Sequence, residues 1–90
     1  MSVRYRVQRT YELTGRGPAA LGWLEDGEIP FSASTLQVEG TAKVVRIRSR
    51  EMHSSSTEDG ELLGIFLHPE DADLVTAGTV LVGPADAATA

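Results

Sequence analysis

Three arginines at alternate positions are the side chains in this sequence best suited to binding chemistry. Arg46, Arg48 and Arg50 alternate with Val45 and Ile47. Side chains two residues apart in a strand project from the same face, so this spacing predicts a strand with a basic outer face. Guanidinium groups in such a row can contact consecutive phosphates, and binding of that kind depends steeply on salt concentration.

Two further basic residues extend this candidate surface. Lys43 precedes the arginine strand, and Arg16 lies in the turn formed by residues 15–18, Gly-Arg-Gly-Pro. A turn residue is often selected for backbone reasons, so a structural role for Arg16 competes with a contact to RNA or to a partner protein. The candidate contact residues are Arg16, Lys43, Arg46, Arg48 and Arg50.

The charge distribution supports two interpretations of this surface. All eight basic residues lie within the first fifty positions, and the net charge of the whole chain is -5. One half of the chain can therefore face an anion while the other half repels it. A merely solvated strand face is the favoured alternative, because the acidic half opposes nucleic acid and few aromatic residues are present to stack bases.

Other chemistry has little support in the sequence. The chain has no Cys, and its two histidines, His53 and His68, have no suitably spaced acidic partner for a metal site. Glu70, Asp71 and Asp73 do not follow the pattern of a calcium loop and are expected to be charges at a helix start. No arrangement typical of catalysis is visible, so we expect a non-enzymatic protein without a cofactor or metal.

The elements that position these residues are short strands. Apolar and polar residues alternate in several segments separated by Gly, Pro or Asp signals, and these segments cover residues 3–13, 19–24, 35–38, 45–49, 62–67 and 79–82. Arg9 interrupts the alternation of the first segment, which predicts either a β-bulge or a strand start near Arg9. Residues 53–60 are expected to be an exposed loop, and residues 69–73 a short helical turn.

The pattern as a whole predicts an all-β domain, either a sandwich or a barrel. Almost no segment has helical periodicity, and 90 residues are enough for one core. We expect one domain over residues 1–84 and a disordered tail over residues 85–90. No apolar run approaches the length of a membrane helix and no signal peptide is visible, so a soluble cytoplasmic protein without a membrane partner is expected.

Four short motifs occur in order along the chain. The first spans residues 11–17, Tyr-Glu-Leu-Thr-Gly-Arg-Gly, with Gly22 and the turn at residues 24–27 after it. The others are residues 50–52, residues 60–67 and residues 77–81. In order and spacing these motifs resemble the second domain of translation GTPases, in particular that of elongation factor Tu. The resemblance covers roughly residues 5–84 and implies a six-stranded, mostly antiparallel closed barrel with Greek-key connections.

The sequence also departs from that family. It has no Gly-x-x-x-x-Gly-Lys-Ser/Thr loop, so nucleotide binding by this chain alone is not expected. Where the family has acceptors around its pocket for the aminoacyl group, this chain has Gln8, Arg9, Leu21 and Leu62, and Tyr11 alone keeps the family's character. A cationic ammonium group would meet Arg9 instead of an acid, so delivery of aminoacyl-tRNA is disfavoured.

Two functional hypotheses follow from the resemblance. The leading hypothesis is a stand-alone, non-enzymatic binding or accessory barrel that contacts the ribosome, RNA or a translation-related protein. The alternative is a protein-interaction subunit that docks a separately encoded GTPase or enzyme.

Overall fold

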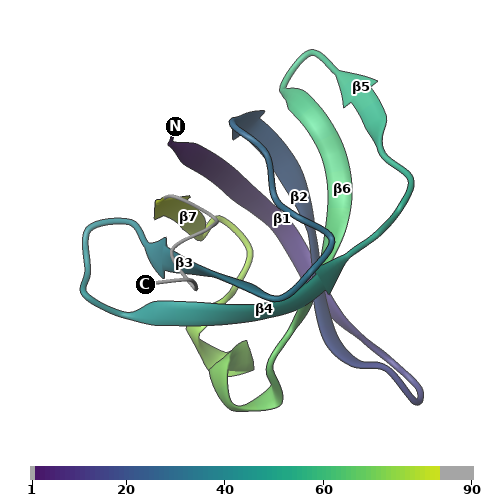
Figure 1. Cartoon of the computed structure of the whole chain (residues 1–90), viewed down its shortest axis with the longest axis vertical. Helices are drawn as coiled ribbons and strands as arrows, with labels where there is room; N and C mark the ends of the chain where they lie inside the picture. The colour runs from purple at the N-terminus through teal and green to yellow at the C-terminus, as the bar shows by residue number, and fades with distance from the viewer. Residues whose placement is uncertain (1, 84–90) are drawn as a thin grey trace.

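The computed structural model describes residues 2–83, which form seven strands and one short 3-10 helix (Figure 1). The elements are β1 (Val3–Leu13), β2 (Gly17–Asp26), β3 (Ser34–Val38), β4 (Val44–Arg50), β5 (Ser55–Thr57), β6 (Gly60–Leu67), η1 (Pro69–Leu74) and β7 (Val80–Gly83). Each strand and the helical turn expected from the sequence is present. The tail expected at residues 85–90 lies outside the described residues.

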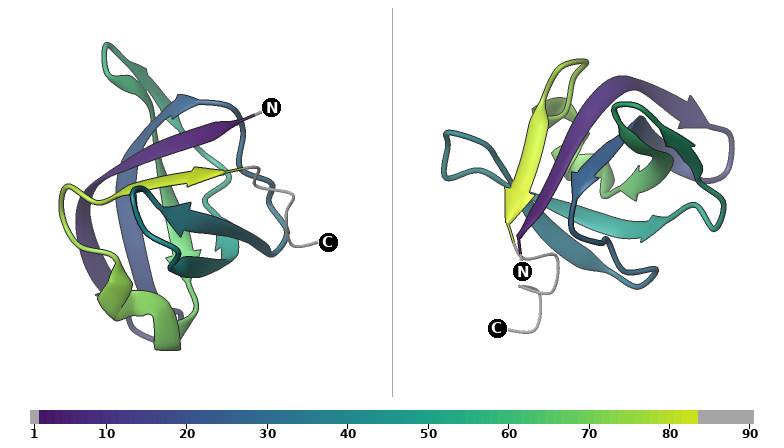
Figure 2. Two further views of the ribbon diagram at one scale, coloured as in Figure 1. Left: turned by 90° about the vertical axis from the view of Figure 1, so that its left-hand side faces the viewer. Right: turned by 90° about the horizontal axis from the view of Figure 1, so that it is seen from above.

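Six of these strands close into a barrel. Around it the strands pair in the order β1, β2, β6, β4, β3 and β7, with β7 returning to β1, and every pairing is antiparallel. Several neighbours are not consecutive in the chain, as Greek-key connections require (Figure 2). The predicted all-β, six-stranded closed antiparallel barrel is therefore confirmed.

The seventh strand corrects one prediction. β5 lies in the segment expected to be a loop, and it pairs with β6 through a tight hairpin in which Thr57 opposes Gly60. The Thr57 hydroxyl donates to the Gly60 carbonyl oxygen at 2.6 Å, and Gly60 has a φ of 125° that a side chain would strain. β5 carries only exposed polar residues, so its sequence has no apolar period to reveal it.

The barrel interior is filled by side chains from its strands and from two connecting segments. The buried cluster consists of Val3, Tyr5, Val7, Ala20, Leu24, Ile29, Leu36, Val45, Ile47, Leu63, Ile65, Leu67, Val75 and Leu81. Tyr5 is completely buried, and its hydroxyl donates to the Leu63 carbonyl oxygen at 2.8 Å. Burial raises the pKa of Tyr5, so this hydroxyl stays protonated and keeps donating.

Two irregularities shape the N-terminal hairpin. The β1–β2 register shifts between Val7 and Arg9, which confirms the bulge that the sequence offered there as one of two alternatives. Gly22 marks a close approach of backbones, because a Cβ atom there would lie 2.3 Å from the Arg6 carbonyl oxygen. The long curved hairpin that results holds the turn carrying Arg16 at one end of the barrel (Figure 1).

Candidate functional site

The predicted alternation along β4 is correct as far as Arg48 and wrong after it. The β4–β6 ladder is irregular between Ile47 and Ser49, and Arg48 is the extra residue. Ser49 then pairs with Phe66, which lies on the outer face, and Arg50 pairs with a core residue of β6. Cross-strand partners share a face, so the bulge turns Ser49 outward and takes Arg50 out of line with the other two arginines.

Arg50 is half-buried and serves the connection between β2 and β3. Its guanidinium group donates to the carbonyl oxygens of Glu51, at 3.1 Å, and Ile29, at 3.3 Å. It also lies 4.7 Å from the centroid of the Phe31 ring. Through these contacts Arg50 holds the loop around Ile29.

Arg46 is engaged by the acidic helix η1. Its Nε donates to Asp71 Oδ2 at 2.8 Å, its Nη2 to Oδ1 at 3.2 Å, and its backbone N–H also donates to Oδ2 at 2.8 Å. This hydrogen bonding lowers the pKa of Asp71, although the burial of that carboxylate opposes the shift. Asp71, predicted to be a helix-start charge, is thus also the group that ties η1 to β4.

Arg16 and Arg48 come together at the end of the barrel. Arg48 donates from Nε to the Leu67 carbonyl oxygen at 3.0 Å and from Nη2 to the carbonyl oxygen of Arg16. The Arg16 guanidinium lies over the Phe66 ring, 4.4 Å from its centroid. Within residues 2–83 neither arginine forms an ion pair with a carboxylate.

These two arginines border a small hollow, which we call the cationic corner. It has a volume of about 180 Å³ and is lined by Gly15, Arg16, Arg48, Ser49 and Phe66. The corner offers guanidinium N–H groups and a hydroxyl within one small space, and the Phe66 ring beneath Arg16 is almost fully buried. An anion such as a phosphate can accept hydrogen bonds from both guanidinium groups there.

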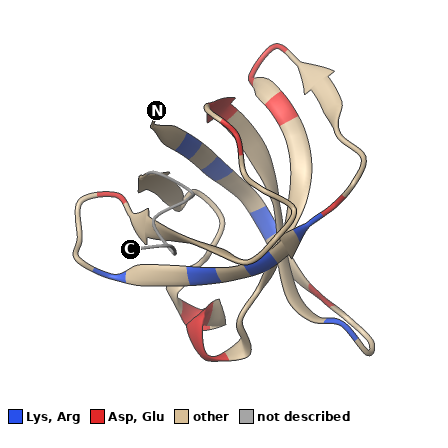
Figure 3. Ribbon diagram, viewed as in Figure 1, with Lys and Arg blue, Asp and Glu red and all other residues tan. Residues whose placement is uncertain are grey.

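The structure therefore divides the five predicted contact residues. Arg16 and Arg48 share the cationic corner, whereas Arg46 and Arg50 are bound elsewhere in the fold. Lys43 is exposed in the turn before β4, at the opposite end of that strand from Arg50 (Figure 3). Sequence reasoning missed Ser49 and Phe66 as members of the site, because only the β4–β6 register shows that both face outward.

Three residues that the sequence comparison singled out lie around a second hollow. Tyr11, Leu21 and Leu62 line a space of about 290 Å³ together with Glu51 and His53. Arg9 lies nearby on β1, opposite Leu21 and 5.3 Å from the centroid of the Tyr11 ring. Gln8 is exposed and does not line this space. The two leucines contribute apolar side chains to its lining, and Glu51 contributes a carboxylate.

Fold and site together define a closed β-barrel with one cationic corner. No protein-family model matches the chain, and no curated protein sequence does so either. Within residues 2–83 no group of three or more His, Asp or Glu side chains is arranged to hold a metal ion. No helix of the described part of the chain is long and apolar enough to cross a membrane.

Proposed function

We propose that this chain is a non-enzymatic, cytoplasmic β-barrel module that contacts RNA, in the ribosome or bound to a translation-related protein, through the cationic corner. The observation that carries the proposal is the convergence of Arg16 and Arg48, neither ion-paired within residues 2–83, on one hollow. The resemblance of the sequence to the second domain of translation GTPases supports the same class of partner.

The side chains of the corner suit a phosphate of a nucleic acid backbone. A guanidinium group presents its donors in a planar fork that matches the oxygens of a phosphate. Arg48 is held by two backbone carbonyl groups, so little rotamer freedom is left to lose on binding. The hydroxyl of Ser49 adds a hydrogen-bonding group beside the phosphate site. The ring of Phe66 is buried beneath the Arg16 guanidinium and supports it from below.

The rest of the surface limits this contact to a small footprint. The chain carries a net charge of -5, and its acids include those of η1 and of the β5–β6 hairpin (Figure 3). A polyanion is repelled by those regions, so contact at one or two phosphates is expected, with modest affinity that falls as salt is added.

An amide spectrum of labelled protein tests the proposal. Adding a ribosomal RNA hairpin at low salt should shift the amides of residues 15–17 and 48–49, and Arg16→Gln should remove most of that shift. Lys43→Gln removes the same charge at the far end of β4 and is the matched control. Unchanged spectra, or equal losses in the two variants, would contradict a contact at the corner.

A second candidate function is docking to a separately encoded protein, such as a GTPase or an enzyme. Two large apolar side chains favour it, since Phe31 is 57% exposed and Met52 is 79% exposed. Affinity capture from the native cell with elution by increasing salt separates the two functions. An RNA partner should elute as salt rises, whereas a protein held by Phe31 and Met52 should remain bound and be lost in the Met52→Ser variant.

A further inference from the structure

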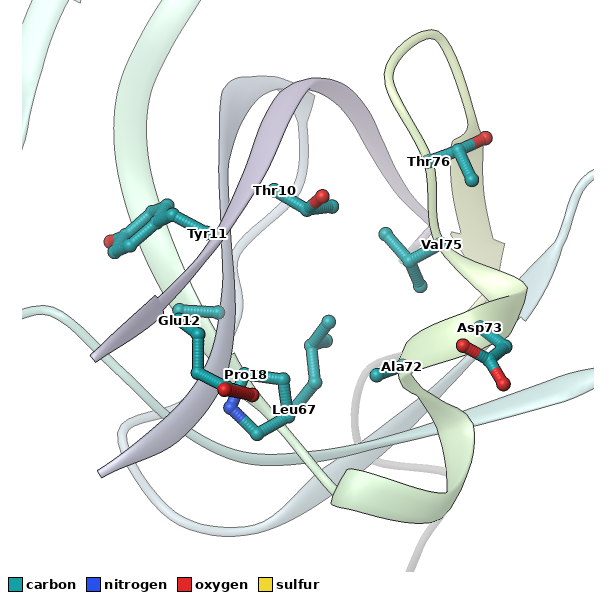
Figure 4. A pocket seen from close by; sticks show the side chains of 10 residues that line it. Thr10, Tyr11, Glu12, Pro18, Leu67, Ala72, Asp73, Val75 and Thr76 are labelled. Carbon is teal, nitrogen blue, oxygen red and sulfur yellow. The ribbon is translucent and has the colours of Figure 1, made fainter. Parts of the chain in front are cut away.

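A larger hollow lies at the end of the barrel between the β1–β2 hairpin and η1 (Figure 4). Its volume is about 450 Å³, which falls within the range of about 300–1,000 Å³ that is usual for small-molecule sites. Both the hairpin and η1 contribute to its wall, which therefore joins segments far apart in the chain. This hollow is distinct from the cationic corner and from the hollow lined by Leu21 and Leu62, although Tyr11 borders both of the larger hollows.

The floor of the hollow is apolar. Leu67 and Val75 extend from the core, and Pro18, Ala19 and Ala72 lie beside them. Leu67, Val75 and Ala19 are almost fully buried, whereas Pro18 and Ala72 are partly exposed and can contact methylene groups of a ligand. A purely ionic ligand would leave this floor unused.

The rim of the hollow is acidic and carries no positive charge. Glu12 and Asp73 lie on opposite sides, with Pro18, Leu67 and Ala72 between them (Figure 4). Both carboxylates belong to exposed residues, and within residues 2–83 neither forms an ion pair. The ten residues that line the hollow include no Lys, Arg or His.

We propose that this hollow binds a linear aliphatic polyamine, with one ammonium group at Glu12, another at Asp73, and the methylene chain across the apolar floor. Charge and shape both lead to this class of ligand. Carboxylates separated by an apolar surface are complementary to a molecule that has cationic ends and an apolar middle. An anion is repelled by the rim, and a compact metal ion cannot contact both the rim and the floor.

The proposal is tested with spermidine and the intact chain. We expect saturable binding to one site in calorimetry, with amide shifts at residues 10–12, 18–19 and 72–76. The double variant Glu12→Gln/Asp73→Asn should weaken the affinity by roughly tenfold, since an exposed ammonium–carboxylate pair contributes a factor of about three.

Matched controls separate a built site from general attraction to an acidic protein. Glu28→Gln/Glu58→Gln changes the net charge equally at exposed acids outside the hollow and should leave the affinity within a factor of about two. Equal weakening by the two double variants would overturn the proposal. So would displacement of spermidine by Mg²⁺ at equal charge concentration, or the same shifts with 1,6-hexanediol, which has the aliphatic chain without the charges.

Discussion

Replacing Asp71 by Asn is expected to destabilise the barrel without affecting RNA binding. The carboxylate of Asp71 is buried and accepts three hydrogen bonds from Arg46, two from the guanidinium group and one from the backbone. An amide at this position keeps one acceptor oxygen and loses the charge. Asp71→Asn thus weakens the link between η1 and β4 while the cationic corner keeps its residues.

The expected magnitude follows from the exposure of the two partners. A hydrogen bond to a charged group contributes about 1.5–3 kcal/mol when it is shielded from water, and an exposed ion pair contributes less than about 1 kcal/mol. The Asp71 side chain is 11% exposed and the Arg46 side chain 49% exposed, so the pair lies between these limits. We expect a loss of about 1.5 kcal/mol, which lowers the Tm of a domain of this size by roughly 6–12 °C.

Thermal and urea unfolding of four variants measure this loss: Asp71→Asn, Arg46→Gln, the double variant and Asp73→Asn. Asp73→Asn is the matched control, because it removes the same charge from the same helix at an exposed residue and should cost less than about 0.5 kcal/mol. Combining Asp71→Asn with Arg46→Gln should cost clearly less than the two single losses added together. If Asp71→Asn and Asp73→Asn were equally stable, or if the double variant were fully additive, the assigned role of Arg46 would be refuted.

Three further predictions concern the fold. Gly22→Ala should destabilise by about 1–3 kcal/mol in urea unfolding, because its Cβ would lie 2.3 Å from the Arg6 carbonyl oxygen, and wild-type stability would contradict that close contact. Tyr5→Phe should cost about 1 kcal/mol by the same assay through the loss of a buried hydrogen bond, and no loss would argue against that bond. Hydrogen bonds lower the pKa of Asp71 and of Glu25 in the folded chain. The stability that these two carboxylates contribute should be fully present above about pH 4.5 and be lost as acid protonates them in the folded protein. A Tm that rises below about pH 4 would contradict the assignment.

The barrel could be predicted from the sequence because its strands have a buried and a wet face. Alternation identifies β1 and β4, and the interruption at Arg9 identifies the bulge, since a basic residue on an apolar phase conflicts with the pattern. β5 could not be found in this way. Its three polar residues are held against β6 by the hairpin turn. Their side chains stay exposed, so the sequence shows no alternation of apolar and polar residues there.

The candidate site was less predictable because it depends on strand register. The arginine alternation continues unbroken through Arg48, and serine is compatible with either face, so nothing local marks the bulge between Ile47 and Ser49. Phe66 lies in a continuous apolar run, which does not show which side chains face out. The Arg46–Asp71 pair joins residues 25 positions apart. The two meet because β4 pairs with β6 and η1 follows β6 in the chain.

The salt dependence of RNA binding tests the central claim most directly. The dissociation constant of the wild-type chain for a ribosomal RNA hairpin would be measured over a series of salt concentrations, beside Arg16→Gln and Lys43→Gln. If the corner holds a phosphate, the slope of log Kd against log salt should fall by about one in Arg16→Gln and stay unchanged in Lys43→Gln. Identical slopes for all three proteins, or no binding at low salt, would contradict the account.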